Sequence, residues 1–302
     1  MSAPGPIVVA APSAWQRATR SGGLAIGLVL ALAMVAMALA APWLAPYDPN
    51  AQDVLLKLEP PSAAHPFGTD DFGRDVLSRV IYGARISLFV GAVATLVGVL
   101  VGTIIGVVAA QKRDGFVDWL ARIVSLAGLS FPAFVSGILL LIAFAVELRW
   151  FPVISTVTST DPLSRLRALA LPSINLGLIM VAYVTRVTRS GMLKALSDDY
   201  VRTARAKGLP NRLVVWRHAL RNVLIPIVTV IGLYLGVLIG NAVLTEIVFN
   251  RPGLGKLIVS ALNLRDYSLL QGLMVVTALA VVVANILTDL TYGLVDPRVK
   301  AS

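Results

Sequence analysis

The sequence predicts an all-α integral membrane protein with six transmembrane helices, and two observations support this prediction. First, 57% of the 302 residues are hydrophobic and only 14% are charged, whereas a soluble domain carries about 25% charged residues. Second, six long stretches contain no Asp, Glu, Lys or Arg. A bilayer core about 30 Å thick needs about 20 apolar helical residues, and backbone amides in lipid must pair within their own segment. The stretches are Ser21–Tyr47, Ile86–Gln111, Ile123–Val146, Ala168–Thr185, Asn222–Thr245 and Tyr267–Thr288.

The first stretch allows a second interpretation, a secretory signal peptide. Arg17 and Arg20 precede it, and Ala38-Leu39-Ala40 has the small residues of a cleavage site. Its apolar run exceeds the roughly 7–15 residues typical of such a peptide, which favours a membrane span. Residues 1–22 are predicted to form a disordered cytoplasmic tail.

Composition excludes several classes of site. The chain has no cysteine, so disulfides, cysteine-ligated zinc, iron–sulfur clusters and thiol nucleophiles are excluded. Its two histidines, His65 and His218, lie far apart in the sequence. We therefore predict no metal site and no catalytic residue, and we interpret His65 as structural.

The charge distribution predicts the orientation. With the N-terminus in the cytoplasm, 16 of the 26 basic and 6 of the 16 acidic residues fall in inner segments, so the inner face carries the whole net charge of +10. The positive-inside rule then places both termini in the cytoplasm. Because the basic excess follows the topology and is not interleaved with aromatic residues, nucleic acid is excluded as a partner.

Three regions follow from this topology. After the tail 1–22, residues 23–85 hold the first span, a proline-rich external loop and an amphipathic interfacial helix that starts at Asp75 and leads into the second span. Residues 86–300 hold the other five spans, with a cytoplasmic loop at 186–222.

The loop Arg186–Arg221 predicts two short helices. Ser197 is a suitable N-cap for a helix of about ten residues from Asp198 to Lys207, with Asp198 and Arg202 as an i,i+4 ion pair. Gly208 and Pro210 end this helix, and Asn211 caps a second helix over 212–222. Physical reasoning leaves two interpretations open: a basic helix on an anionic lipid surface, or a preformed element that docks into another protein.

The same loop carries a family resemblance. Residues 199–208 read D-Y-V-R-T-A-R-A-K-G, and residues 216–222 read W-R-H-A-L-R-N. This pattern resembles the "EAA" loop of binding-protein-dependent ABC importer permeases. Ala204, Gly208 and Leu220 match the general motif. The departures, which the peptide importer branch shares, are Arg202, Thr203, His218 and Arg221.

Other stretches resemble two subunit types of that branch. Residues 44–49 and 68–88 look like the C-type subunit of dipeptide, oligopeptide and nickel importers. Residues 245–255 and 294–298 look more like the B-type subunit. The resemblance covers residues 24–298, and the mosaic leaves open which of the two positions the chain occupies and whether it pairs with a copy of itself.

The resemblance implies a type I ABC importer permease in the cytoplasmic (inner) membrane, which moves peptides or a similar small solute by alternating access. It implies a second permease subunit (paralogue or copy), two cytoplasmic ATP-binding subunits and an extracytoplasmic solute-binding protein. ATP and Mg would be bound by the ATPase partners. The coupling-loop residues are then Asp199, Tyr200, Val201, Arg202, Thr203, Ala204, Arg205, Ala206, Lys207 and Gly208. Within them, helical geometry makes Val201, Ala204 and Ala206 candidates for the close contacts.

Polar residues in or near the spans are candidates for the translocation path, because a polar group in lipid is costly. Hydrogen bonds that tie helices together are the alternative reading. The candidates are Asn175, Tyr183, Asn241, Glu246, Asn285 and Asp289. By contrast, Gly98, Gly102 and Gly106 predict a close-packing face in the second span, and Pro132, Pro172 and Pro226 predict kinks.

Two further readings are weighed against the permease. The segment 252–257, P-G-L-G-K-L, is not a phosphate loop, because Asn250 replaces its first glycine and Leu257 its Ser or Thr; without such a loop, ATP hydrolysis must come from partner subunits. An ATPase-independent secondary transporter or channel is the alternative function. An intramembrane enzyme lacks any metal-protease, serine-protease or paired-aspartate motif in a span.

Overall fold

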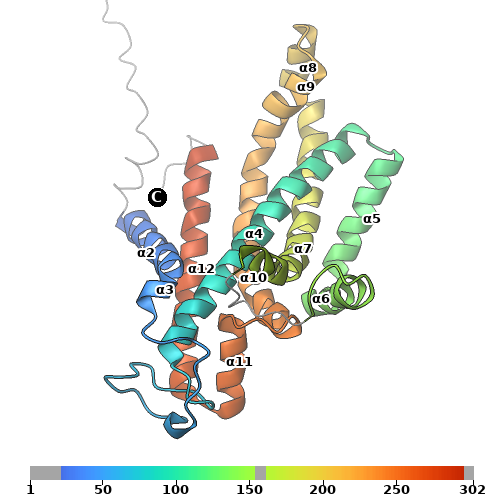
Figure 1. The fold of residues 1–302 in the computed structure, drawn as a ribbon. Helices are drawn as coiled ribbons and strands as arrows, with labels where there is room; N and C mark the ends of the chain where they lie inside the picture. The colour runs from blue at the N-terminus through green and yellow to red at the C-terminus, as the bar shows by residue number, and fades with distance from the viewer. Residues whose placement is uncertain (1–21, 154–160, 296–302) are drawn as a thin grey trace, which may run out of the picture.

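A computed structural model describes residues 22–153 and 161–295 as a bundle of long helices (Figure 1). Within these ranges the β-type pairing consists of one isolated bridge between Thr69 and Asp75. The elements are α2 Gly22–Leu39, α3 Ala41–Leu44, η1 Val54–Leu56, α4 Val76–Gln111, α5 Phe116–Ser130, α6 Ala133–Leu141, η2 Ile142–Glu147, α7 Pro162–Ser197, α8 Asp199–Ala206, α9 Asn211–Leu213, η3 Val214–Ala219, α10 Leu220–Val248, α11 Leu254–Leu264 and α12 Tyr267–Val295. Both η2 and η3 are π-helical.

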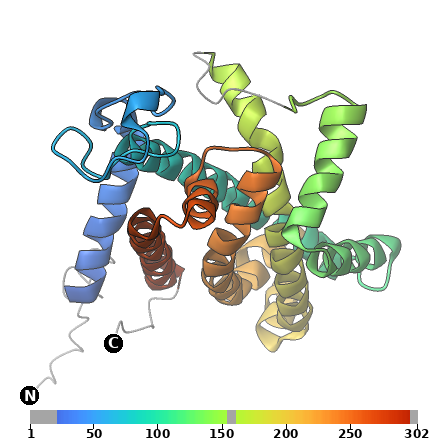
Figure 2. The same cartoon turned by 90° about the horizontal axis from the view of Figure 1, so that it is seen from below.

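The helices α4, α7 and α10 occupy the middle of the bundle. Figure 2 shows α2 and α12 at one edge and α5 and α6 at the other. In Figure 1, α8 and α9 lie at one end, whereas α11 and the loop that precedes α4 lie at the opposite end. The connections predicted to be cytoplasmic and external are therefore on opposite ends of the molecule.

The glycines of α4 allow it to pack closely on α7. A Cβ atom added at Gly102 would lie 2.8 Å from the Cβ of Val184 and 2.9 Å from the carbonyl oxygen of Val181. The prediction of a close-packing glycine face is confirmed, since small residues let two backbones approach. The facing pairs are Gly98 with Met180, Gly102 with Val184 and Gly106 with Thr188.

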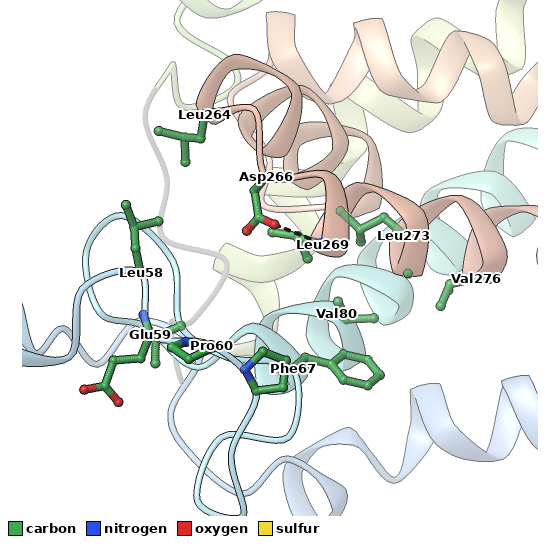
Figure 3. Close-up of a pocket in the computed structure, with 13 residues that line it drawn as sticks. Leu58, Glu59, Pro60, Phe67, Val80, Leu264, Asp266, Leu269, Leu273 and Val276 are labelled. Atoms are coloured by element: carbon green, nitrogen blue, oxygen red, sulfur yellow. Dashed lines mark hydrogen bonds between the residues drawn. The ribbon is translucent and has the colours of Figure 1, made fainter.

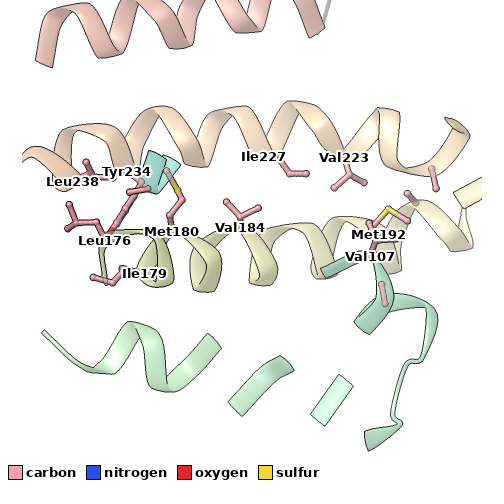
Figure 4. Close-up of a cluster of buried hydrophobic side chains, with 14 of the residues drawn as sticks. Val107, Leu176, Ile179, Met180, Val184, Met192, Val223, Ile227, Tyr234 and Leu238 are labelled. Atoms are coloured by element: carbon pink, nitrogen blue, oxygen red, sulfur yellow. The ribbon is translucent and has the colours of Figure 1, made fainter. Parts of the chain in front are cut away.

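The main hydrophobic core lies among α4, α7 and α10. Met192 of α7 lies near Val223 of α10 (Figure 4), and Met180 and Val184 of α7 contact the glycines of α4. The cluster extends through Val201 in α8, so α8 is packed onto the end of the same core.

The N-terminal end of α4 is held by the loop that precedes it. Asp75 caps α4 by accepting a hydrogen bond from the amide of Ser78 at 2.8 Å, and its other oxygen lies 3.0 Å from Nδ1 of the buried His65. The ring of Tyr47 lies 4.8 Å from that of His65. The structural role predicted for His65 agrees with this network.

The predicted interfacial helix and the second span form one continuous element, α4, of 36 residues. The region boundary placed at residue 85 therefore falls inside a helix. No proline and no left-handed residue interrupts residues 76–111. The helix therefore runs unbroken from its N-cap at Asp75.

The predicted span over Ile123–Val146 is not one straight helix, because α5 and the α6–η2 segment meet at an angle of 107°. Pro132 has no amide hydrogen and restricts the preceding residue to extended conformations. Phe131 accordingly has φ −86° and ψ 130°. The kink predicted at Pro132 is a sharp bend, whereas Pro172 and Pro226 lie inside the continuous helices α7 and α10.

Four helical segments of the described chain are long and apolar enough to cross a membrane, and the bent α5–α6 pair would make five. The four are Val76–Gln111, Pro162–Ser197, Asn211–Val248 and Leu269–Ile286. In α2, Leu28–Leu39 is a further apolar helical stretch. The predicted tail before Gly22 lies outside the described residues.

Candidate functional site

The helix α8 stands at the end of α7, from which only Asp198 separates it (Figure 1). The N-cap is Asp198 and not Ser197, so that prediction is wrong. Ser197 is the last residue of α7, and its hydroxyl donates to the carbonyl oxygen of Lys194 at 2.7 Å. Asp198 makes no side-chain capping bond; its carbonyl accepts from the amide of Val201 at 3.1 Å.

The predicted ion pair between Asp198 and Arg202 is also replaced. The Arg202 guanidinium lies 3.5 Å from the carboxylate of Asp199, one residue later, and both side chains are exposed. Such surface pairs contribute about 0–1 kcal/mol. This pair therefore does little to hold α8 in place.

Apolar packing holds α8 instead. Val201 and Ala204 are buried and belong to one cluster with Val214 and Val215 of η3. The prediction that Val201 and Ala204 contact a partner is wrong, because these side chains already face their own chain. Exposed side chains remain for a partner: Asp199, Tyr200, Arg202, Thr203, Arg205, Ala206 and Lys207.

Gly208 turns the chain after α8. Its φ of +75° is in the left-handed region, where glycine has no Cβ penalty. Its amide donates to the carbonyl of Arg205 at 2.9 Å. The predicted glycine stop is confirmed. The next helix begins at Asn211 with Pro210 as N-cap, so Asn211 is not the cap that the sequence predicts.

The second loop helix continues into α10 as one helical segment, Asn211–Val248. It includes the π-helical turn η3, Val214–Ala219. Val214, Val215 and Ala219 are buried, whereas Trp216 and Arg217 are exposed. Through these buried residues, the segment Asn211–Val248 packs against α8 and links it to the core of the bundle.

Asn175, a path candidate, ties three helices together. Its side-chain amide donates to the carbonyl of Ala133 in α6 at 3.0 Å and to the hydroxyl of Thr245 in α10 at 3.3 Å. Its oxygen accepts from the Ser136 hydroxyl at 2.7 Å. Asn175 is fully buried, so these bonds favour the helix-tying alternative at this position.

Glu246, another path candidate, caps α11 from outside that helix. Its carboxylate accepts from the amides of Gly255 at 2.8 Å and Lys256 at 3.2 Å, and from the hydroxyl of Ser87 at 2.5 Å. That hydroxyl in turn accepts from the amide of Leu254 at 3.1 Å. The first three residues of α11 are thus paired with α10 and α4. The sequence showed a polar residue here but not its partner.

Tyr183 and Asn241 are the candidates with accessible side chains in the core helices. Tyr183 of α7 is exposed, and its ring lies 5.0 Å from that of the buried Tyr234 of α10. Asn241 is half-buried, and Asn285 of α12 is exposed. The side chain of Asp289 lies outside the described residues.

Of two hollows in the structure, one is lined in part by a path candidate, Glu246, and the other by none. One, of about 570 Å³, lies among α2, α4, α10 and α12 and is lined almost entirely by aliphatic side chains, with Glu246 and Thr95 among the polar exceptions. The other, of about 450 Å³, lies between Pro60 and Phe67 of the loop and Leu269 of α12 (Figure 3). Among the described residues, no cluster of three or more His, Asp or Glu side chains could hold a metal ion.

Long apolar helices, with a short packed helix at one end, define a polytopic membrane protein. Comparison with known families identifies it further. Residues 102–301 match the family described as "Binding-protein-dependent transport system inner membrane component". Residues 13–61 match "N-terminal TM domain of oligopeptide transport permease C". The chain belongs to the binding-protein-dependent inner membrane components.

Several curated proteins are similar to this chain. The Di/tripeptide transport system permease protein DppB of Pseudomonas aeruginosa is 43% identical over 220 residues, 66% of each chain. The Dipeptide transport system permease protein DppB of Bacillus subtilis is 37% identical over 230 residues, 76% of this chain and 71% of the relative. The Glutathione transport system permease protein GsiC of Pectobacterium atrosepticum is 41% identical over 202 residues, 67% and 64% respectively.

These matches confirm the resemblance to the peptide importer branch, including the mosaic character. The N-terminal match is to a permease C domain, whereas two of the three relatives are named DppB. The chain is a multi-pass permease subunit of the inner membrane, and its family lacks ATPase activity.

Proposed function

We propose that this chain is one half of the membrane pore of an ATP-driven importer for short peptides. Peptide transport is inferred from the relatives, whose names refer to dipeptides, di/tripeptides and glutathione. The chain crosses the membrane six times, with α2 and the bent α5–α6 pair as two of the spans and with both termini in the cytoplasm.

The observation that best supports the proposal is how α8 is packed: which of its sides is buried, which is exposed and how it ends. This helix buries Val201 and Ala204 in its own core and exposes the opposite side. Gly208 closes it with a tight turn. A short helix that is packed against the ends of α7 and α10 can transmit a displacement to them, whereas a flexible loop would deform instead. We therefore assign Asp199–Gly208 as the segment that receives the motion of an ATPase subunit.

The charge of this end supports its cytoplasmic placement. Basic residues gather on and after α8, and the acidic loop that precedes α4 lies at the far end. Arg202, Arg205 and Lys207 are exposed and suit an acidic partner surface.

The partners follow from the family. Two ATPase subunits bind ATP and Mg, a second permease subunit completes the pore, and an extracytoplasmic binding protein delivers the solute. The membrane helices then exchange inward-open and outward-open states as rigid bodies. Among the path candidates, Tyr183, Asn241 and Asn285 retain accessible side chains, which suits them to face the solute.

Co-purification tests this proposal. We expect the chain, extracted in mild detergent from its native membrane, to carry an ATPase subunit and a second permease subunit. A chain that transports di- and tripeptides in vesicles without any ATPase subunit would instead establish the ATPase-independent transporter.

A further inference from the structure

An ion pair between a buried carboxylate and a half-buried guanidinium joins α5 to α7 at the end of the molecule that bears α8. Asp118, in the first turn of α5, has a side chain with 0% exposure. Arg189 of α7 donates to both of its oxygens, from Nε to Oδ1 and from Nη2 to Oδ2 at 2.8 Å. Such a two-bond fork fixes the relative orientation of its partners as well as their distance.

The same carboxylate also holds the turn between α4 and α5. The amide of Asp114, a residue with φ +60°, donates to Oδ2 of Asp118 at 3.1 Å. Asp118 therefore joins three elements at one point: the end of α4, the start of α5 and the side of α7.

The position of Arg189 along α7 connects this point to two other contacts. It directly follows Thr188, which packs on Gly106 of α4. It precedes Ser197, the last residue of α7, by eight residues, about 12 Å of helix. The C-terminal end of α7, which carries α8, is thus bound to α4 by close packing and to α5 by the ion pair.

The other end of α5 leads to the sharp bend at Pro132 and then to α6. The first turn of α6 contacts Asn175 of α7. Between these points α5 rests on α7 through small groups: a Cβ at Gly128 would lie 3.1 Å from that of Ala182. The ion pair adds to this packing a directional contact that sets how α5 follows α7.

We propose that Asp118 and Arg189 are positioning residues that make α5 move with α7 when an ATPase subunit displaces α8, an inference that rests on the proposed function. The displacement passes from α8 along α7, through the ion pair, to α5 and the bent span. Without the pair, α8 still docks and ATP is still hydrolysed, but α5 lags behind α7 and transport per ATP falls.

A stabilising role alone would not need this arrangement. Buried ion pairs are weak evidence for stability, because apolar pairs of similar volume often stabilise a fold as well or better. An apolar contact, however, would not fix the angle between the two helices as the guanidinium fork does. Arg122 provides an internal comparison: it lies 3.7 Å from the same carboxylate, but it is 51% exposed and belongs to α5 itself.

The test uses the complete complex, with binding protein, reconstituted in proteoliposomes with a radiolabelled mixture of di- and tripeptides. Asp118→Asn and Arg189→Gln should lower peptide taken up per ATP by about tenfold, a typical size for coupling between sites, while complex yield and ATPase rate stay near wild type. Arg189→Lys, which keeps the charge and loses the fork, should be intermediate. Arg122→Gln should transport normally.

A second measurement does not depend on the solute. Because the chain has no cysteine, spin labels can be placed at Leu126→Cys on α5 and Lys194→Cys on α7, both exposed. The distance between them should stay sharp with and without trapped nucleotide in the wild-type background, and should broaden or shift with nucleotide in Asp118→Asn.

Three outcomes would overturn the inference: normal transport per ATP in Asp118→Asn, equal losses of yield, ATPase and transport, or an unchanged label distance in that variant. The proposed function fails separately, if the wild-type chain purifies without an ATPase subunit.

Discussion

At the residue scale, the two sides of α8 differ in whether their side chains are buried, and this difference matters more than their charge. Val201 and Ala204 face the chain's own core, and Arg202 and Thr203 face outward. The sequence pattern predicts a helix here, but it cannot tell which face is already covered, because the covering residues, Val214 and Val215, lie beyond the turn.

The glycines of α4 give a residue-scale prediction. Gly102→Ala should destabilise the folded chain by about 1–3 kcal/mol, the usual cost of overpacking, because the new methyl group would meet Val184 and the backbone of Val181. Gly236→Ala in α10 is the matched control, since no atom lies within 4 Å of the added Cβ. Thermal unfolding in detergent measures both. Equal melting temperatures in the two variants would refute the close contact.

At the element scale, local signals in the sequence predict some ends well. Gly208 and Pro210 correctly end α8, and Asp75 starts an element where the predicted interfacial helix starts. The caps assigned to Ser197 and Asn211 are wrong by one residue each, because α7 extends to Ser197 and Pro210 takes the cap position itself. Ends that depend on neighbouring helices are not visible in a local pattern.

Gly208 can be tested by a pair of substitutions. Gly208→Val should abolish uptake and leave membrane insertion intact, because a Cβ in the left-handed region costs roughly 1–2 kcal/mol and would reshape the turn. Space is not the reason, since no atom lies within 4 Å of the added Cβ. Gly208→Asn, which tolerates this region, should retain uptake. Full uptake by the valine variant would count against a docking role for the turn.

The cap on α11 yields a second element-scale prediction. Glu246→Ala removes the acceptor of the Gly255 and Lys256 amides, and an unpaired buried donor costs about 1–3 kcal/mol. Hydrogen exchange at the start of α11 should therefore become faster. Glu246→Gln keeps an acceptor oxygen and should exchange almost as slowly as the wild type. If hydrogen exchange at the start of α11 is unchanged in the alanine variant, Glu246 does not cap that helix, and a role in the translocation path is the better explanation.

At the scale of the whole molecule, hydropathy predicts the membrane class, and the resemblance predicts the family. The bend between α5 and α6 could be anticipated only as a kink at Pro132, since its angle of 107° depends on packing against α7 and α10. The junctions made by Asn175, Glu246 and Asp118 join residues far apart in the sequence. These contacts could be found only from the structure.

The central claim is that the exposed side of α8 meets an ATPase subunit in the cytoplasm. The most direct measurement is cross-linking in native membranes from a single cysteine, Thr203→Cys, in this cysteine-free chain. Leu55→Cys, 91% exposed at the opposite end, is the control. We predict that position 203 cross-links to an ATPase subunit and resists a membrane-impermeant thiol reagent added to intact spheroplasts, whereas position 55 reacts with the reagent and does not cross-link. Labelling of position 203 from outside, or cross-linking to the ATPase subunit from position 55 alone, would contradict the account.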